Sequence, residues 1–482
     1  MRANMQSQIS LGLNTISIDQ AEEIHLATLE VLDRVGVNIF EKEALEMLKQ
    51  KGAVVENCRV RIPAWMVQEA LATAPCRVAL GNRNGERAMW LEKGRVYFGS
   101  GSATQYVMDI SNGERRPTVK QDVGNAAKVA DGLANIDFVM SMSLASDVPK
   151  ANAFIHEFEA MVLNTAKPIL YCADHRRDVE DIIAMAETVA GGARELAANP
   201  FLVLYAEPSS PLQHTEETIK KLLLCAEKKL PVICGPAVMM GATGPVTAAG
   251  ALVVANCEIL SGLVVHQLKS PGAPFIYGGG VPAMDMKTSL CSYGSPEEHL
   301  NSAVMVNMAQ YYRLPVFTTA GCSDSHAFDQ QAGFEAGFNM LAHGLAGSNL
   351  IHDMGYMGAG AATSLEMLVL CNETAGMVKH YLKGIEIEPE TLALDVIEKV
   401  GPGGNFFAEE HTFLNFKKHL YFPQLLNRYS YDKWKEAGAT TFDKRANQKV
   451  RDILENHQSP ELPKDTVARV KEIVAKRDAQ MT

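Results

Sequence analysis

The sequence predicts an α/β protein whose central unit is a (β/α)8 TIM barrel. The first observation behind this prediction is a local pattern that occurs five times: a proline, several mostly apolar residues, then a polar or glycine-rich tail. Proline lacks a backbone N–H group and is tolerated at the first residue of a strand, so each run predicts a short buried strand with a marked start. The five runs are residues 168–174, 200–207, 231–235, 274–278 and 315–321.

The second observation is the rhythm of these runs, which recur at intervals of roughly 30–45 residues with helix-like stretches between them. Three further apolar runs, 96–99, 138–143 and 350–353, fit the same rhythm. Eight strands in one alternating series predict a barrel of parallel strands. The active sites of such barrels lie at the carboxyl ends of the strands, so the polar tails are where we look for function.

The chain divides into three segments. Residues 1–93 form a predicted helical extension, with helices over 19–32 and 41–51 and a third after Pro63. Residues 94–385 form the barrel, with a hairpin near 94–119 that turns at Asn112-Gly113. Residues 386–482 hold a glycine-rich loop at 401–407 and a charged helical tail from Tyr431, broken at Pro460 and Pro463.

Composition narrows the class of protein. The net charge of −11 is spread along the chain, which argues against a nucleic-acid or membrane-surface partner. The nine cysteines are scattered singly, which suits a reducing cytoplasm. The first eight residues contain no apolar core of a secretory signal. The apolar stretch 248–265 is interrupted by Asn256 and Glu258, so we expect a barrel helix there and not a membrane span.

Alternation within the strands predicts which side chains fill the barrel. Counted from each proline, even offsets carry mostly aliphatic residues, which we expect to face the helices, and Cys172 falls on that face. Odd offsets are expected to face the lumen; they carry Tyr171, Tyr205, Glu207, Cys234, Tyr277, Thr318 and Cys322. Tyrosines also plug tapering barrels by simple packing. Three tyrosines and a carboxylate on one face favour a site.

Six segments in order resemble the trimethylamine methyltransferase superfamily: residues 22–37, 60–63, 96–101, 116–119, 401–407 and His411-Thr412. The resemblance extends from about residue 15 to 430. It implies a TIM-barrel subunit of a homo-oligomer that moves a methyl group from an amine to the Co(I) of a separate corrinoid protein. Archaeal members carry pyrrolysine, whose position we expect within 321–329. This chain has only ordinary residues, like the branch that demethylates quaternary amines such as glycine betaine.

The chemistry of a quaternary amine fits such a site. Loss of a methyl group leaves a neutral tertiary amine, so the leaving group needs no proton and no general acid. Aromatic faces bind the cationic ammonium. The predicted cage residues are Tyr97, Tyr171, Tyr205, Tyr277 and Tyr356, with Glu207 or Asp324 as a counter-charge. A counter-charge that is too close stabilises the ground state, so the aromatic residues carry more weight.

A betaine also has a carboxylate, which needs hydrogen-bond donors. We expect these from His326, from His352 and from the amides of 278–280, with Gly279 at the centre. Asp324 and His326 are expected to position the substrate. Each histidine could instead be a structural imidazole, and the glycines could serve only to turn the backbone. His411 could cover the mouth or stabilise a turn.

Other chemistries compete with this interpretation. Zinc would use Cys172, Cys234, Cys322 and His326, but the paired spacing of zinc ligands is missing. A Schiff-base aldolase needs a lysine inside a strand, whereas Lys167 precedes its strand and Lys287 follows a loop. Proline betaine, carnitine or a tertiary methylamine are alternative substrates. A non-catalytic quaternary-amine binding protein is the alternative from another class. We therefore expect no metal, and no cofactor bound to this chain itself, with the cobalamin held by the partner.

Overall fold

The computed structural model describes residues 12–480. The first residues of the chain, on which the expected absence of a secretory signal depends, lie outside this range.

Seven parallel strands and the bridging segment 138–139 form a closed barrel. The seven-stranded sheet runs in the order β6, β17, β16, β13, β12, β10, β9. Bridges Gly99–Phe138 and Val139–Ile169 insert residues 138–139 between β6 and β9 and close the ring. The strands are β6 (Tyr97–Ser100), β9 (Ile169–Cys172), β10 (Leu202–Ala206), β12 (Val232–Cys234), β13 (Phe275–Gly278), β16 (Val316–Thr319) and β17 (Leu350–Met354). The predicted barrel and its eight strand runs are confirmed.

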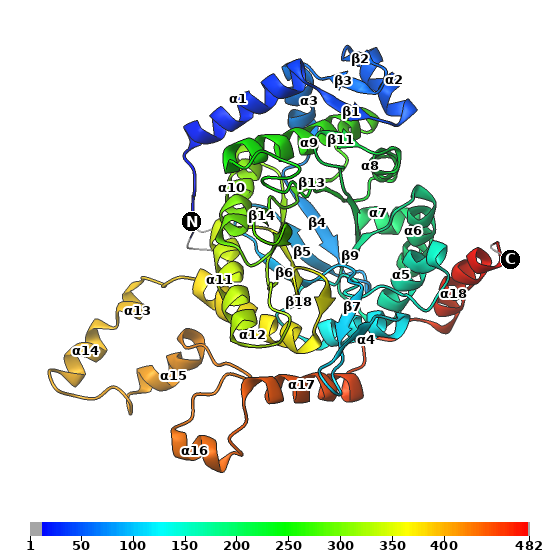
Figure 1. Cartoon of the computed structure of the whole chain (residues 1–482). Coiled ribbons are helices and arrows are strands. Elements are labelled where there is room, and N and C mark those ends of the chain that lie inside the picture. The colour runs from blue at the N-terminus through cyan, green and yellow to red at the C-terminus, as the bar shows by residue number, and fades with distance from the viewer. Residues whose placement is uncertain (1–11, 481–482) are drawn as a thin grey trace.

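A ring of helices surrounds the strands (Figure 1). Side-chain caps mark several of their starts: Ser295 for α10, Asp329 for α11 and Ser364 for α12 each accept a hydrogen bond from an amide in the first turn. The helices are α4 (Lys120–Gly132), α5 (Ala153–Asn164), α6 (Arg176–Ala190), α7 (Ala193–Ala198), α8 (Glu216–Lys228), α9 (Ala248–Lys269), α10 (Pro296–Tyr312), α11 (Gln330–Ala346) and α12 (Leu365–Leu382).

The N-terminal extension covers one side of the barrel. Helices α1 (Ile18–Arg34), α2 (Lys42–Lys51) and α3 (Ala64–Thr73) all contact α9. A small sheet with the order β11, β1, β3, β2 accompanies them; its strands are Gln213–His214, Val37–Ile39, Arg59–Arg61 and Val54–Glu56. Within the described residues α9 alone is long and apolar enough to cross a membrane, and 72% of its most apolar window is buried. It is apolar on all sides because it lies between the barrel and this extension.

Hairpins elaborate both ends of the barrel. The hairpin of β4 (Val78–Gly81) and β5 (Arg87–Leu91), absent from the sequence prediction, packs Leu80 and Met89 against the barrel interior from the amino-terminal end. The predicted Asn-Gly hairpin is confirmed as β7 (Tyr106–Met108) and β8 (Arg115–Pro117). The loops at the carboxyl end also hold β14 (Ala283–Asp285), β15 (Leu290–Ser292), β18 (Tyr356–Met357) and β19 (Ala362–Thr363).

The C-terminal segment has two different parts. Helix α17 (Phe442–Asn456) packs on α12 and α4, and α18 (Lys464–Ala479) packs on α5 and α6. Arg477 of α18 forms an ion pair of 2.7 Å with Asp178 of α6, and both side chains are buried. In contrast, α13 (Pro389–Leu392), α14 (Leu394–Val400), α15 (Glu410–His419) and α16 (Tyr431–Glu436) stand away from the barrel (Figure 1). The boundaries 1–93, 94–385 and 386–482 stay a prediction.

Candidate functional site

The barrel interior is lined by one contiguous apolar cluster. It contains Leu170, Val203, Ile233, Ile276 and Phe317, and Tyr205 packs against it. In β9, β12, β13 and β16 the interior residues therefore stand at even offsets from the proline, opposite to the sequence prediction. Only β10 has its odd offsets inside, because Leu202 begins this strand two residues after Pro200, whereas the other strands begin one residue after their proline. A shift of one residue exchanges the two faces of a strand.

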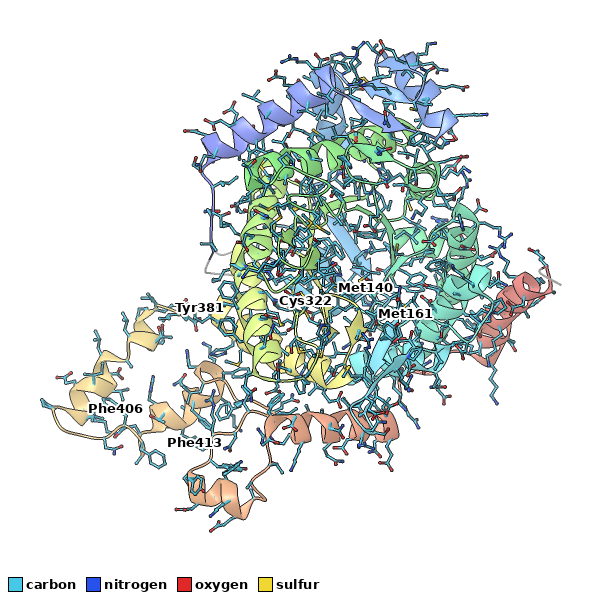
Figure 2. The ribbon with its side chains drawn as sticks, viewed as in Figure 1. Met140, Met161, Cys322, Tyr381, Phe406 and Phe413 are labelled. Carbon is cyan, nitrogen blue, oxygen red and sulfur yellow. The ribbon has the colours of Figure 1, made fainter. Side chains whose placement is uncertain are left out.

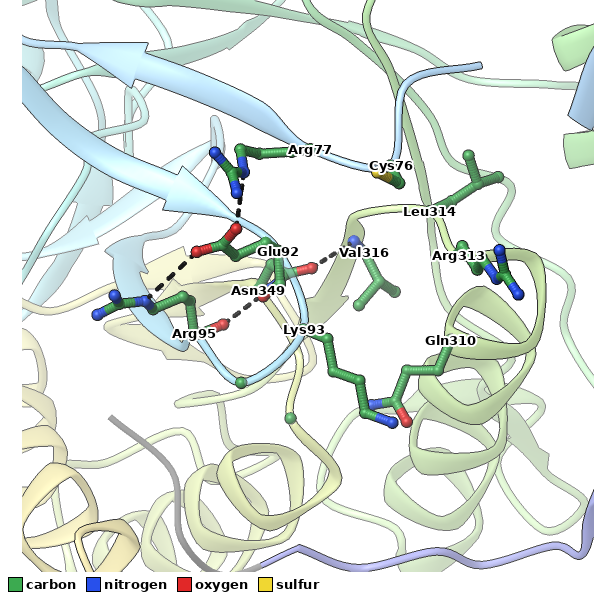
Figure 3. Close-up of a pocket in the computed structure, with 12 residues that line it drawn as sticks. Cys76, Arg77, Glu92, Lys93, Arg95, Gln310, Arg313, Leu314, Val316 and Asn349 are labelled. Carbon is green, nitrogen blue, oxygen red and sulfur yellow. Dashed lines mark hydrogen bonds and ion pairs between the residues drawn. The ribbon is translucent and has the colours of Figure 1, made fainter. Parts of the chain in front are cut away.

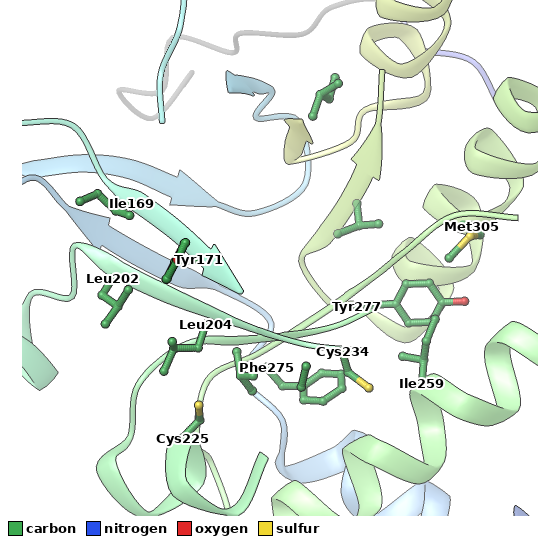
Figure 4. Close-up of a cluster of buried hydrophobic side chains, with 14 of the residues drawn as sticks. Ile169, Tyr171, Leu202, Leu204, Cys225, Cys234, Ile259, Phe275, Tyr277 and Met305 are labelled. Carbon is green, nitrogen blue, oxygen red and sulfur yellow. The ribbon is translucent and has the colours of Figure 1, made fainter. Parts of the chain in front are cut away.

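Tyr171 and Tyr277 consequently face the helices, and their predicted place in the lumen is wrong. The Tyr171 hydroxyl donates to Oε2 of Glu157 on α5 at 2.7 Å. The Tyr277 hydroxyl donates to Oδ1 of Asn256 on α9 at 3.1 Å. Both rings belong to the hydrophobic layer between strands and helices (Figure 4). They are packing residues of that layer and do not line the barrel interior.

The predicted faces of Cys172 and Cys234 are also exchanged. Cys172 pairs in register with Tyr205 and follows interior Leu170 by two residues, so it lies on the inner face and not on the outer one. Cys234 belongs to the outer layer. Thr318 likewise faces the helices, where its hydroxyl lies 2.9 Å from Nδ1 of His343.

Tyr97 is interior but lies at the wrong end of the barrel for catalysis. It is the first residue of β6, and its hydroxyl accepts a hydrogen bond of 3.0 Å from the amide of Trp90 in the β4–β5 hairpin. That hairpin covers the amino-terminal end, while active sites of this architecture lie at the carboxyl end. Tyr97 is therefore removed from the predicted cage.

An irregularity at the end of β17 brings two polar side chains together at the mouth. The pairing of β17 with β6 shifts register between Ile351 and Met354, and Asp353 has φ of +76°. Nδ1 of His352 lies 2.7 Å from Oδ1 of Asp353, although these residues are consecutive. In a regular strand consecutive side chains point to opposite faces, and bulges near active sites redirect them. Neither atom makes a hydrogen bond of good geometry.

The ring of His352 is fixed from two directions. It stacks on Phe317, with ring centroids 4.0 Å apart and planes inclined by 13°. Its Nε2 lies 3.0 Å from the hydroxyl of Thr319 on the neighbouring strand. The Tyr205 ring also packs against Phe317, with ring centroids 5.7 Å apart, and the Tyr205 hydroxyl donates to the carbonyl of Gly235. The predicted residues Tyr205 and His352 thus share one wall.

Two more tyrosines lie around Asp353. The rings of Tyr293 and Tyr356 both come close to Gly360, where an added Cβ would lie 3.3 Å and 3.6 Å from them. Burial raises the pKa of Tyr293 and of Tyr356 well above the usual value, and the charge of Asp353 raises it further. Both rings are therefore neutral hydroxyl-bearing surfaces at neutral pH. The Tyr356 hydroxyl is 2.5 Å from that of Ser102.

Two glutamates with raised pKa values lie near this cluster. Glu298 of α10 is 1% exposed, and burial raises its pKa to about 7, with the nearby charge of Asp353 acting in the same direction. Its Oε2 has no hydrogen-bond partner. Glu207 follows β10 and is exposed, but partial desolvation still raises its pKa, against the opposing charges of Lys221 and His352. Lys221 is itself committed to the carbonyl of Ala173 at 2.8 Å.

Asp324 organises the loop that presents Tyr293. Its carboxylate accepts hydrogen bonds from the hydroxyl of Ser292 at 2.5 Å and from the amides of Tyr293 and Gly294 at 2.8 and 3.1 Å. This supports the predicted positioning role through the loop more than a role as a direct counter-charge. His326 is exposed, and its ring lies against Gly358.

The predicted donor role of Gly279 is wrong. Its amide donates to the carbonyl of Phe317 at 3.2 Å, and the amide of Gly280 donates to that of Pro236 at 2.9 Å. Gly279 has φ of +117°, and a Cβ there would lie 2.3 Å from the Pro236 carbonyl oxygen. The glycine is required so that two strand tails can approach each other. Its amide is not available to a carboxylate.

Sequence reasoning missed four residues of this cluster: Phe317, Asp353, Glu298 and Tyr293. Phe317 was assigned to the outer face because all strands were assumed to alternate in the same way from their prolines. Asp353 was visible beside His352, but the bulge that turns it inward leaves no mark in the residue pattern. Glu298 and Tyr293 lie in or after a loop, where no periodicity predicts their direction.

Two cavities lie elsewhere in the molecule, outside this cluster. One of about 430 Å³ lies at the opposite end of the barrel, between the β5–β6 turn and the ends of α10 and α11 (Figure 3). It is lined by Arg77, Glu92 and Arg313 among others, and Arg77 and Glu92 form an ion pair of 2.7 Å. Across residues 12–480, no group of three or more His, Cys, Asp or Glu side chains is arranged to hold a metal ion.

Comparison with known proteins agrees with the fold and the residue pattern. The family model of trimethylamine methyltransferase (MTTB) matches residues 4–482. The chain is 34% identical to the trimethylamine methyltransferase MttB of Desulfitobacterium hafniense, over 96% of this chain and 94% of that protein. It is 32% identical to a glycine betaine methyltransferase of the same species, over 97% and 98%.

The solved structure of the Methanosarcina barkeri monomethylamine methyltransferase aligns with a TM-score of 0.51 at 12% identity, covering 94% of this chain and 89% of that one. At this identity the likeness concerns the fold alone. The extent of the family match and of the two sequence relatives is decisive: the chain belongs to the trimethylamine methyltransferase family.

Proposed function

We propose that this methyltransferase moves a methyl group from a quaternary amine to the Co(I) of a separate corrinoid protein, with glycine betaine as the substrate. The observation that carries the proposal is the cluster of Tyr205, Tyr293 and Tyr356 near the Asp353 carboxylate at the barrel mouth. Aromatic faces and a buried negative charge are the surroundings that a quaternary ammonium prefers. The relative named glycine betaine methyltransferase supports the choice of substrate.

The reaction requires this chain to bind and orient the substrate, but not to supply the nucleophile. The corrinoid supplies the nucleophile, which takes the methyl group without its bonding electrons, and the amine departs with that electron pair on a nitrogen that is now neutral. The residues of this chain therefore bind and orient the ammonium and exclude water. Tyr205 and the Phe317–His352 stack form one wall, while Tyr293 and Tyr356 lie near Asp353. Positioning and electrostatics of this kind account for large parts of enzymatic rate enhancement.

The positive charge of the substrate decreases as the methyl group leaves. Asp353 therefore stabilises the bound ground state at least as well as the transition state, and its main expected contribution is to substrate affinity. For the carboxylate of a betaine, His326 remains the candidate at the rim, since the Gly279 amide is committed. Proline betaine, carnitine and a tertiary methylamine stay as alternatives; a relative named for trimethylamine is as similar as the betaine relative.

Two features support a corrinoid carried by the partner. The segment 324–329 has the Asp-x-His spacing of a corrinoid-binding motif but ends in aspartate where that motif has glycine. Its carboxylates are engaged within the chain: Asp324 holds the 292–294 loop, and Asp329 caps α11 through the amide of Ala332.

The nine singly spaced cysteines support a cytoplasmic location.

A substrate screen tests this proposal. The purified protein is mixed with a Co(I) corrinoid protein, and methylation of the corrinoid is followed by absorbance for glycine betaine, proline betaine, carnitine and trimethylamine. We expect turnover with glycine betaine that needs both proteins. Turnover only with trimethylamine would contradict the quaternary-amine assignment, and no turnover with any of the four would contradict the proposed reaction.

A further inference from the structure

Three Arg or Lys side chains are buried in the part of the chain that the structure describes: Arg83, Lys221 and Arg477. Arg477 pairs with Asp178 where α18 packs on α6. Arg83 follows β4 in the hairpin at the amino-terminal end of the barrel, and its guanidinium donates to the carbonyl of Val162 at 2.6 Å. Lys221 of α8, which is 6% exposed, differs from both in its place in the fold.

Two hydrogen bonds place the first turns of α8 over the ends of two barrel strands. Nζ of Lys221 donates to the carbonyl of Ala173, the first residue after β9, at 2.8 Å. One turn earlier, the hydroxyl of Thr218 donates to the carbonyl of Glu207, the first residue after β10, at 2.7 Å. The Lys221 ammonium therefore lies at the carboxyl end of the barrel, the end that holds active sites in this architecture.

The Lys221 ammonium keeps donors for a ligand. A lysine ammonium has three N–H donors, and the Ala173 carbonyl takes one of them. Lys221 forms no ion pair with a carboxylate of residues 12–480, whereas its more exposed neighbour Lys220 pairs with Glu216 and Glu217. Lysines are almost never buried without a charged partner, because burial removes the hydration of the ammonium. A buried ammonium with two further donors is suited to an anionic ligand.

Inner-face residues connect Lys221 with the mouth. Cys172 pairs in register with Tyr205, and Glu207 follows Tyr205 by two residues, so the three share one face. Burial raises the pKa of Cys172 to about 11, and the charge of Lys221 acts against this rise. Burial also raises the pKa of Glu207, while the charges of Lys221 and His352 both lower it. Glu207 is thus close enough to sense Lys221 on one side of the mouth and His352 on the other.

The remaining charges of the mouth are negative. Cys322, in the tail that follows β16, lies inside the ring of helices (Figure 2). Burial raises the pKa of Cys322 well above its usual value, and the charges of Asp353, Glu298 and Asp324 raise it further. These carboxylates attract an ammonium group but repel the carboxylate of a betaine. A zwitterionic substrate therefore needs a cation on the side of the mouth away from Asp353.

We propose that Lys221 binds the carboxylate of a zwitterionic quaternary amine, and so sets the preference for a betaine over a quaternary amine without a carboxylate. The inference rests on the proposed function and names the residue that recognises the acid group of that substrate. Strands β12, β13 and β16 separate β10 from β17, so the two lie on opposite sides of the ring. The ammonium end of the substrate then lies towards Asp353, and the carboxylate end lies towards Lys221.

Other groups are less suited to this role. His326 is exposed at the rim, and the amide of Gly279 donates to the carbonyl of Phe317. Asp174 and Glu207 follow the same two strands as the Lys221 contacts, but both are exposed, and water screens exposed charges. A hydrogen bond from a buried ammonium to a carboxylate is charge-assisted at both ends and is stronger than a neutral one.

The test measures ligand affinity by titration calorimetry on the full-length protein without the corrinoid protein. The two probes are glycine betaine and tetramethylammonium, which has no carboxylate. Lys221→Met keeps the apolar stem and removes the charge. We expect it to bind glycine betaine about 10–100-fold more weakly, the loss expected for a hydrogen bond between charged groups. Tetramethylammonium should bind as tightly as to the wild type, or more tightly. Lys220→Met is the matched control and should keep both affinities.

A structural role for Lys221 predicts a different outcome. It would weaken both ligands equally or neither, and either result in a folded variant would overturn the proposal. Lys221→Gln retains a donor for the Ala173 carbonyl and is measured alongside, with thermal unfolding of each variant. Loss of folding in both variants would assign Lys221 a structural role and would also overturn the proposal.

The wild-type protein separates this inference from the proposed function. Wild type that binds tetramethylammonium as tightly as glycine betaine would overturn the role of Lys221 and leave a quaternary-amine site in place. Wild type that binds neither probe would instead contradict the proposed function, and the inference would fail with it.

Discussion

Asp353 and His352 are neighbours in the chain and neighbours in space, with Oδ1 of one 2.7 Å from Nδ1 of the other. This arrangement requires the bulge at the end of β17 and the positive φ of Asp353. Asparagine and aspartate tolerate that conformation better than other residues with a side chain. The bulge places a buried carboxylate amid the tyrosines of the mouth.

We expect Asp353→Asn to weaken catalysis mainly through KM. Asparagine keeps the shape and the backbone conformation but removes the charge that attracts the ammonium. A loss of about 2 kcal/mol, or about 30-fold in kcat/KM, is expected for such a charge in a partly buried site. Steady-state kinetics with a matched thermal melt measure it. Asp19→Asn, an exposed carboxylate on α1, is the control. An unchanged KM in a folded Asp353→Asn enzyme would remove Asp353 from the site.

Glu298→Gln should change the pH dependence of stability. Burial raises the pKa of Glu298 to about 7 from 4.5, so the folded protein binds this proton more tightly than the unfolded chain. The contribution of the Glu298 side chain to the free energy of unfolding is fully present below pH 4.5. It is lost as pH rises towards and through 7, by an amount on the order of 3 kcal/mol. Glutamine mimics the protonated form and does not titrate.

Denaturant unfolding at several pH values measures this difference. Glu157 and Glu258 have similarly raised pKa values of about 7, but they are present in both proteins and cancel. The stability of Glu298→Gln relative to wild type should therefore rise between pH 4.5 and 7. Glu297→Gln, at the exposed neighbouring position, should show no such trend. Parallel curves for wild type and Glu298→Gln would show that Glu298 ionises normally.

The purified protein should contain no stoichiometric zinc and should keep its activity after treatment with a chelator. The cysteines are unpaired in sequence, and Cys172 and Cys234 lie on opposite faces of the barrel wall. Elemental analysis and an activity assay before and after chelation provide the measurement. One zinc per chain, with activity lost on its removal, would contradict this prediction.

The chain expressed alone should carry no corrinoid. Asp324 and Asp329 are occupied by hydrogen bonds within the chain, and His326 is exposed. The absorbance spectrum of the purified protein, recorded with and without the corrinoid protein, tests this expectation. A tightly bound corrinoid in this chain alone would be the contrary result.

The sequence predicted the barrel well because a proline precedes the start of five of its strands. Proline stands one residue before β9, β12, β13 and β16, and the family resemblance agreed with the count of strands. The assignment of side chains to the two faces of the strands was wrong for most strands because Pro200 stands two residues before β10. Side chains alternate with a period of two, so a difference of one residue exchanges the inner and outer faces. The predicted face was correct for Tyr205 and inverted for Tyr171 and Tyr277. The bulge at Asp353 and the loop that presents Tyr293 arise from tertiary contacts that no local pattern records.

The inversion gives the sharpest test of the site, because Tyr205 and Tyr277 now have opposite expected signatures. Tyr205→Ala removes a ring from the mouth, where a desolvated cation–π contact contributes about 2 kcal/mol, so kcat/KM should fall by about 30-fold. Tyr277→Ala leaves a cavity between β13 and helices α9 and α10, so it should lower the free energy of unfolding by about 3–5 kcal/mol. Its kcat/KM in the folded fraction should stay near normal.

The phenylalanine variants separate the ring from the hydroxyl. Tyr205→Phe keeps the aromatic face and loses only the hydrogen bond to the Gly235 carbonyl, so it should retain most activity. Tyr277→Phe leaves Oδ1 of Asn256 without that donor and should cost about 1–3 kcal/mol of stability. Melting temperature and kcat/KM for the four variants are measured together. If Tyr205→Ala is stable and fully active, the ammonium is bound elsewhere, and Tyr293 with Tyr356 becomes the cage to be tested next.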